Sequence, residues 1–151
     1  MLILSNWFLK FFKIMATIKK FEDIEAWQKA RELAHQIYLV TKETELNKDY
    51  RFKDQINAAA GSIMDNIAEG FERGGRNEFI NFLTIAKASS GEVRSQLYRV
   101  MDREYITQDK CSALQNLSIE IANMLGGWIS YLNQSTHRGT KFKNRTTDNT
   151  K

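Results

Sequence analysis

The stretch SIMDNIAEGFER, residues 62–73, lies near the middle of the 151-residue chain and links two segments of helical periodicity. The four residues before it, 58–61, are all alanine or glycine, so a neighbouring helix can approach them closely. Gly70 is a suitable residue to follow a helix end, because glycine adopts positive φ at little cost. We therefore predict a helix over about residues 51–69, followed by a turn at residues 71–75.

The segments on either side place apolar residues at the i, i+3, i+4 spacing of helices that bury one face. They predict three further helices, over about residues 21–44 or 23–44, 76–103 and 108–133. Asp23 and Thr107 are candidate N-caps. The connections are short, and the chain contains no proline, which would interrupt long helices. The sequence thus predicts an all-α fold, an antiparallel up-down-up-down four-helix bundle over residues 21–134.

The first predicted helix has a wider apolar arc than docking on one core requires. Beside the stripe that contains Trp27 and Ala34, a second apolar row lies roughly 120° away on the helical wheel. On the third helix, small residues lie opposite the core face; they are either tolerated there or seat another helix. We take the second apolar row of the first helix and the small residues of the third helix as a candidate oligomer interface. Its residues are Ala26, Leu33, Val40, Ala88, Gly91 and Ser95.

The net charge of +4 belongs to the two ends of the chain. Residues 136–151 hold five Lys or Arg against one Asp, and residues 1–14 add two Lys. The intervening part is slightly acidic, which weakens a simple nucleic-acid interpretation. We predict that residues 135–151 are a basic disordered tail, which would attract polyanions weakly. The single cysteine, Cys111, excludes an internal disulfide, and we expect a cytoplasmic protein.

The apolar opening, residues 1–14, is too short to span a membrane, which requires about 20 apolar residues. It is either an interfacial amphipathic helix or the product of an upstream start codon, with Met15 as the true start. We favour the second interpretation. We therefore expect residues 1–20 to be a flexible extension, and no association with a membrane.

Catalytic and metal chemistry have little support in the sequence. Glu32 and His35 form one Glu-x-x-His pair, whereas di-iron bundles need two such pairs, and the other histidine, His137, lies in the tail. Residues 73–76, RGGR, lack the lysine and the spacing of a phosphate-binding P-loop. We expect no metal, no cofactor and no enzymatic activity.

Asn66 and Glu69 lie beside the core stripe of the second helix, where an unpaired polar group would cost stability. We predict that they bond to neighbouring helices or to loop backbone, with Arg73 as the partner of Glu69. With Gly70, they form a structural motif rather than a ligand site.

Several of these residues resemble a known family. The pattern is carried by Phe21, Ile24, Trp27-Gln28, Ala30-Arg31 and Leu33, by Asp54-Gln55-Ile56 and Ala59, and by Ser62-Ile63 with Asn66-Ile67-Ala68-Glu69-Gly70. It resembles the four-helix-bundle proteins encoded in intervening sequences of bacterial large-subunit ribosomal RNA genes. The accessory protein of diversity-generating retroelements is a related bundle. Met64-Asp65 departs from the family's usual Pro-Ala pair, and the proline often found after the first helix is absent.

The resemblance implies a homo-oligomer, typically a pentameric ring, with no established enzymatic activity. The retroelement relative suggests binding to nucleic acid and to a reverse transcriptase. Arg76, Lys87 and Arg94 lie within about 20° of one another on the helical wheel, and a ring would repeat this stripe in every subunit. With Arg73, they are the candidate nucleic-acid contacts; the alternative is a solvated edge paired with acidic neighbours.

We accordingly predict a non-enzymatic oligomeric adaptor that binds structured RNA or a ribonucleoprotein. The alternative is a protein-only scaffold that holds another protein on the ring surface.

Overall fold

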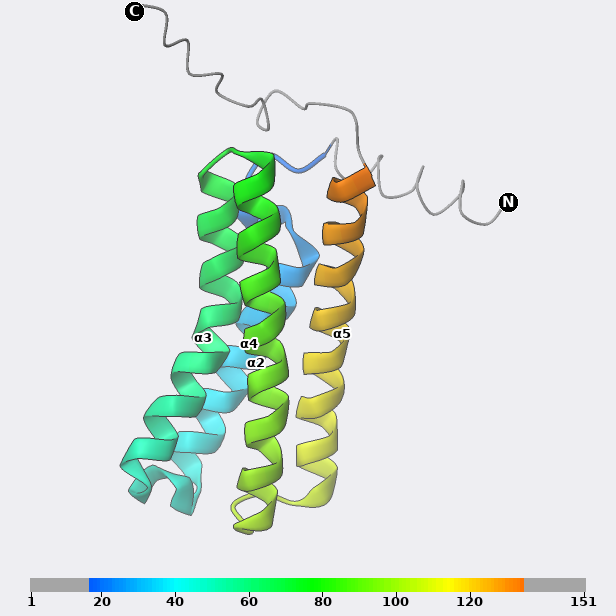
Figure 1. Ribbon diagram of the computed structural model, residues 1–151. Coiled ribbons are helices and arrows are strands. Elements are labelled where there is room, and N and C mark those ends of the chain that lie inside the picture. Colours follow the sequence, from blue (N-terminus) through cyan, green and yellow to red (C-terminus); the bar gives the residue numbers. More distant parts are fainter. Residues whose placement is uncertain (1–16, 135–151) are drawn as a thin grey trace, which may run out of the picture.

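The computed structural model describes residues 17–134, which fold as an all-α four-helix bundle. The long helices are α2 (Glu25–Glu43), α3 (Tyr50–Glu72), α4 (Arg76–Asp102) and α5 (Gln108–Gln134), with short 3-10 turns η1 (Phe21–Asp23) and η2 (Glu45–Lys48). Figure 1 shows consecutive helices running in opposite directions, so the predicted up-down-up-down order is confirmed. Most of the predicted N-terminal extension and the whole basic tail lie outside the described residues.

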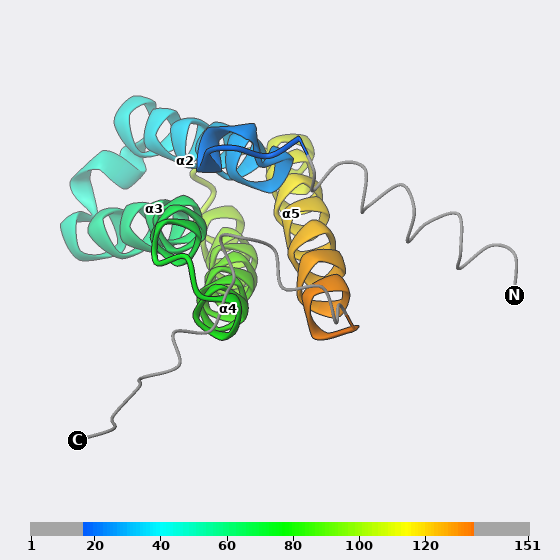
Figure 2. The same cartoon turned by 90° about the horizontal axis from the view of Figure 1, so that it is seen from above.

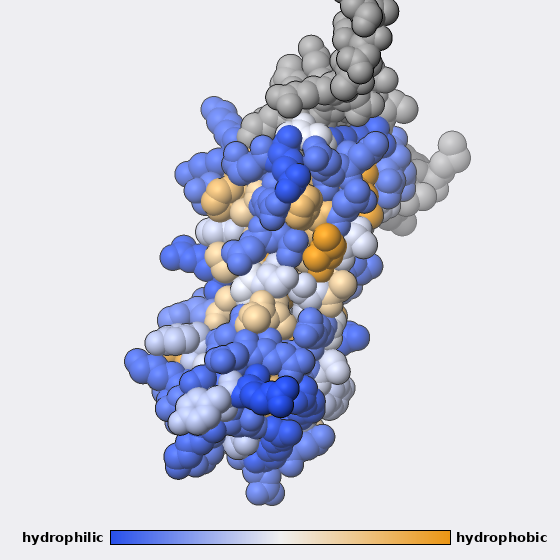
Figure 3. All heavy atoms as spheres, turned by 60° about the vertical axis from the view of Figure 1, so that its left-hand side comes forward, coloured by the Kyte–Doolittle hydropathy of each residue, from blue (hydrophilic) through white to orange (hydrophobic). Residues whose placement is uncertain are grey.

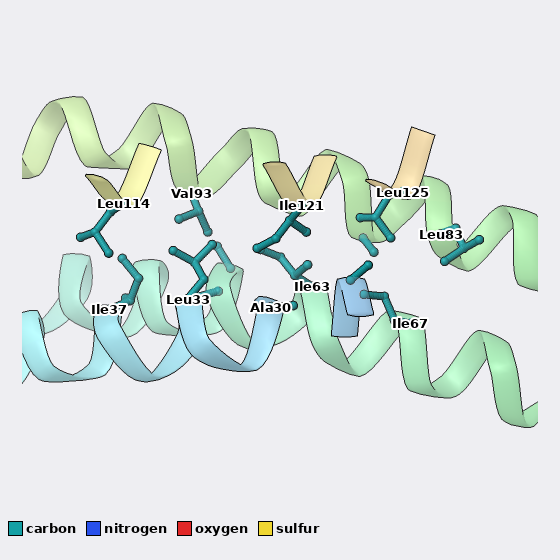
Figure 4. Packing of buried hydrophobic residues seen from close by; sticks show 14 of the residues in the cluster. Ala30, Leu33, Ile37, Ile63, Ile67, Leu83, Val93, Leu114, Ile121 and Leu125 are labelled. Atoms are coloured by element: carbon teal, nitrogen blue, oxygen red, sulfur yellow. The ribbon is translucent and has the colours of Figure 1, made fainter. Parts of the chain in front are cut away.

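The four helices surround a single apolar core. Seen from above, they follow one another around the bundle in chain order, so that α5 closes the circle beside α2 (Figure 2). Figure 4 shows side chains from all four helices pointing toward one another, among them Leu33 from α2, Ile63 from α3 and Ile121 from α5. Because each helix presents one apolar face, the bundle buries these faces together.

Gly70 does not end the second long helix, which was the predicted role. α3 continues to Glu72, and the positive φ of the turn is at Gly74 (73°). Gly70 is buried against α4: a Cβ placed on it would lie 2.5 Å from Phe82 Cβ and 3.1 Å from Phe79 Cδ2. Glycine is therefore required at this position by close helix packing rather than by backbone conformation.

The two predicted N-caps had different outcomes. Asp23 does not cap α2 but lies in η1, where its carboxylate accepts hydrogen bonds from the backbone N–H of Lys19 (3.0 Å) and Lys20 (3.2 Å). The bond from Lys19 is the main reason that the pKa of Asp23 is lowered. Thr107 caps α5 as predicted, since its Oγ1 accepts from Lys110 N at 3.3 Å.

The apolar row that we assigned to an interface on the first helix faces the core. Ala26, Leu33 and Val40 are 1%, 0% and 5% exposed within the single chain, so that half of the predicted interface is wrong. The extra apolar width of α2 has an internal explanation. Phe21 of η1 packs edge-on against Trp27, with ring centroids 5.1 Å apart, and covers the side of α2 next to the core.

Candidate nucleic-acid interface

Arg73, at the C-terminal end of α3, is already engaged by carboxylates. Its Nη2 donates to Glu69 Oε1 at 2.6 Å, and its Nη1 lies 3.7 Å from Glu78 Oε1. The guanidinium also lies 4.8 Å over the ring of Phe82. The hydrogen bond to Glu69 raises the pKa of Arg73, and the pairing of these two residues confirms the predicted partner. A phosphate would have to compete with both carboxylates at this position.

Arg76, the first residue of α4, ties that helix to the end of α5. Its Nη2 donates to the backbone oxygen of Asn133 at 3.3 Å, and its Nε is buried without a hydrogen-bond partner. The residue is half-buried. Arg76 is therefore less accessible to a ligand than its position on the helical wheel predicted.

Lys87 and Arg94 lie together at a shallow groove of about 270 Å³ between α4 and α5. Both side chains are exposed, and neither forms an ion pair with another residue in 17–134. Lys87 reaches toward α5, because its Nζ lies 3.6 Å from the position of a Cβ on Gly126. The four predicted cations therefore do not form one free surface; two of them line a groove, and the other two are tied to neighbouring groups.

The floor of the groove is formed by a pair of buried serines. Ser90 Oγ donates to Ser118 O at 2.7 Å, and Ser118 Oγ donates to Ser90 O at the same distance. The two hydroxyl oxygens lie 2.9 Å apart. These bonds hold α4 and α5 close together, so two small side chains, rather than large ones, lie at the bottom of the groove.

The small residues predicted on the outer side of α4 remain accessible. Ala88, Gly91 and Ser95 are all exposed, and a Cβ on Gly91 would meet nothing within 4 Å. Ile85, on the same helix, is 48% exposed. Figure 3 shows apolar side chains gathered across the middle of the face on the α3 side of the bundle, with hydrophilic side chains below them.

Asn66 forms its hydrogen bonds within α3, which corrects the prediction that it bonds a neighbouring helix or loop backbone. Its Nδ2 donates to Ser62 O at 2.7 Å and to Ser62 Oγ at 2.9 Å. Ser62 makes the contact between helices, since its Oγ lies 3.0 Å from Ser89 Oγ of α4. The motif around Asn66 is thus part of the α3–α4 packing.

The residues considered for metal or redox chemistry are separate from the groove. His35 is exposed on α2, and its neighbour Glu32 accepts a hydrogen bond from Gln36 at 2.9 Å. Within residues 17–134, no three His, Cys, Asp or Glu side chains cluster as a metal site would require. Cys111 is fully buried; burial raises its thiol pKa, and its Sγ lies 3.4 Å from Leu97 O.

A family model described as 23S rRNA-intervening sequence protein matches residues 22–127, from the first turn to the last third of α5. The chain belongs to this family. The matched range contains every residue discussed in this section except Asn133.

A solved structure also resembles this chain. It is a protein of unknown function from the S23 ribosomal protein family of Bacteroides thetaiotaomicron, 30% identical, with a TM-score of 0.64. The match covers 70% of this chain and 95% of that one. A comparison with curated proteins finds no match. In the present chain, no helix within residues 17–134 is long and apolar enough to cross a membrane.

Sequence reasoning missed a second group of cations in this intervening-sequence protein. At the end of the bundle where α2 joins α3 and α4 joins α5, a hollow of about 500 Å³ is lined by Asp49, Arg51, Phe52, Gln55, Arg99 and Arg103. We call it the arginine hollow. Its residues come from the start of α3 and the end of α4, which are far apart in sequence, so no helical stripe contains them all.

Proposed function

We propose that the protein is a non-enzymatic oligomeric adaptor that binds structured RNA or a ribonucleoprotein. The observation that supports the proposal most directly is the groove between α4 and α5, where Lys87 and Arg94 are exposed and unpaired with any described carboxylate. Cations without carboxylate partners can bind phosphate without first breaking an ion pair. The family name, which refers to 23S ribosomal RNA, agrees with a role beside RNA.

The position of the groove fits contact with a sugar–phosphate backbone. Lys87 and Arg94 are seven residues apart, which places them two turns, or roughly 10 Å, apart along α4. Between them lies Gly91, which has no side chain to obstruct approach to the helix. A backbone could therefore contact both cations while it passes over the glycine.

Multivalency is part of the proposal. One groove offers two cations, which supports only weak binding at physiological salt. A homo-oligomer, which we propose to be a pentamer, would repeat the groove in each subunit and raise the apparent affinity. We also propose a relation in function to the accessory protein of diversity-generating retroelements, on the basis of the motif at residues 66–70.

Binding to a fragment of 23S ribosomal RNA tests the proposal, with fluorescence anisotropy measured at several salt concentrations. We expect binding at low salt that weakens steeply as salt increases. The double variant Lys87→Gln/Arg94→Gln should weaken binding and reduce the slope of log K against log salt by about 2 for each groove that contacts the RNA, because each phosphate contact contributes about 1.

The matched control removes the same charge from the opposite side of the bundle. Arg31→Gln/Lys42→Gln changes two exposed cations of α2, far from the groove, and should leave the salt slope unchanged. An equal loss of RNA affinity in the two double variants would show that only net charge matters. It would contradict RNA binding at the groove. If the wild-type protein retains no RNA at low salt but co-purifies with a protein, the scaffold alternative is favoured.

A further inference from the structure

We propose that the arginine hollow is a binding site for a phosphate monoester, such as the 5′-phosphate end of an RNA or a nucleotide. The inference rests on the proposed function only for the RNA form of the ligand. It concerns the opposite end of the bundle from Arg73 and Arg76 and does not involve the groove between α4 and α5.

Arg99, near the end of α4, and Arg103, just after it, both lie over an aromatic ring. Arg99 Cζ lies 4.0 Å and Arg103 Cζ 5.1 Å from the ring centroid of Phe52, which is itself buried. A guanidinium that stacks on a ring leaves its N–H donors free at the edges. Stacking also reduces the side-chain freedom that would be lost on binding an oxyanion.

The hollow is lined by more cationic side chains than carboxylates. Arg103 donates to Asp49 Oδ2, which the hydroxyl of Tyr105 also approaches at 3.4 Å. Arg99 has only a long contact with the amide oxygen of Gln55, at 3.4 Å, and Arg51 is exposed without an ion pair to any described residue. Three guanidinium groups and one carboxylate thus line the hollow, and the net charge of these four side chains is +2.

The start of α3 adds to this positive potential. The helix begins at Tyr50, and its N-cap residue, Asp49, makes no side-chain capping bond to it. The first N–H groups of a helix point outward and attract anions. Arg51, in the first turn, lies at this helix end and also lines the hollow, so the start of α3 lies beside the guanidinium groups.

The charge and the size of the hollow select the ligand class. A phosphate monoester carries about −1.5 to −2 at pH 7, which matches the excess of +2, whereas a phosphodiester carries a single negative charge. Guanidinium groups bind phosphate oxygens through paired hydrogen bonds. The volume of about 500 Å³ lies within the range of about 300–1,000 Å³ typical of small-ligand sites.

Two pairs of probes, used on the full-length protein, test the site. The first pair is AMP and adenosine, measured by calorimetry; the second is one oligoadenylate with a 5′-phosphate or a 5′-hydroxyl. We expect AMP to bind and adenosine not to bind, and the 5′-phosphate to improve oligonucleotide binding about tenfold. An AMP response without an oligonucleotide preference would identify a free nucleotide as the ligand.

The variant Arg51→Gln should weaken AMP binding about tenfold. Arg51 is exposed and has no ion pair with a described residue, so we expect Arg51→Gln to fold, which thermal unfolding checks. Arg99→Lys keeps the charge but loses the planar fork, and it should also weaken binding. Lys48→Gln is the matched control, since Lys48 is exposed at the same end of the molecule but is paired with Glu45 and lies outside the hollow.

The result separates this site from the groove. Failure of AMP to bind, or equal losses in Arg51→Gln and Lys48→Gln, would overturn the arginine hollow while leaving RNA binding through Lys87 and Arg94 intact. Conversely, an AMP site lost in Arg51→Gln would support the hollow even if the protein binds no ribosomal RNA fragment.

Discussion

Gly70 and Gly61 lie on the same helix, yet their surroundings give opposite requirements. A Cβ on Gly70 would lie 2.5 Å from Phe82 Cβ, whereas a Cβ on Gly61 would meet only Asp65 Oδ2, at 3.9 Å. Both residues lie within α3, where alanine has the higher helix propensity. At the scale of the residue, the close approach of α3 and α4 therefore depends on the absence of one methyl group.

Gly70→Ala should destabilise the protein, and Gly61→Ala should stabilise it. Overpacking costs about 1–3 kcal/mol, which exceeds the gain of up to about 1 kcal/mol in helix propensity at Gly70. At Gly61 only the gain applies. Thermal unfolding monitored by circular dichroism measures the difference, and a melting temperature of Gly70→Ala at or above that of Gly61→Ala would contradict the steric explanation.

The contact between α4 and α5 is the clearest case in which two elements are joined by polar groups within an apolar core. Ser90 and Ser118 are both buried and bond reciprocally to each other's backbone oxygen. Each hydroxyl carries one proton, so at most two of the three short contacts between them are hydrogen bonds at any moment. Small side chains let the two helices approach, and the paired hydroxyls satisfy the groups that this approach buries.

We expect the effects of Ser90→Ala and Ser118→Ala to be coupled. Each single variant should cost about 0.5–1.5 kcal/mol, because it removes a buried hydrogen bond and leaves its partner's hydroxyl with fewer contacts. The double variant should cost less than the sum, since it removes both polar groups together. Urea unfolding of the wild type, the two single variants and the double variant measures this coupling. The exposed Ser95→Ala is a control that should change stability by less than about 0.5 kcal/mol. Strictly additive effects would show that the two hydroxyls do not interact.

At the scale of the whole molecule, the bundle has two ends and one open face with different chemistry. The end with the α3–α4 turn holds paired or half-buried arginines, and the other end holds the arginine hollow. Between them, the outer side of α4 presents small residues and the exposed Ile85. Self-association through Ala88, Ser95 and Ile85, none of which lines the groove, would cover apolar surface and leave both ends and the groove accessible.

Native mass spectrometry tests the proposed pentamer. We expect a homo-oligomer for the wild-type protein and dissociation in Ala88→Glu, because a charge introduced at a packed interface has no partner. Ala113→Glu is the control, since Ala113 is exposed near the start of α5 and away from the small-residue side of α4. A monomeric wild-type protein, or an Ala88→Glu variant that stays oligomeric, would contradict an interface on α4.

The number, order and type of the elements could be predicted from the sequence because helical periodicity is local information. The i, i+3, i+4 pattern fixes which residues share a face, and short connections without proline favour antiparallel neighbours. The start of α4 at Arg76, the cap at Thr107 and the Glu69–Arg73 pair depend on nearby residues and were predicted correctly. The face of α2 that packs on the core was not predicted correctly, because η1 packs over Trp27.

The sequence alone determined the four helices, their antiparallel order and the resemblance to the intervening-sequence proteins, since each rests on neighbouring residues or fixed spacing. The tertiary structure decided that Gly70 is a packing residue, that Lys87 and Arg94 share a groove, and that Arg51 meets Arg99 and Arg103 around Phe52. Such contacts join residues on different helices, from 12 positions apart for Gly70 and Phe82 to 52 for Arg51 and Arg103, and they depend on how the helices are rotated and how closely they pack. Sequence periodicity does not determine the rotation of a helix about its axis or the distance between two helices.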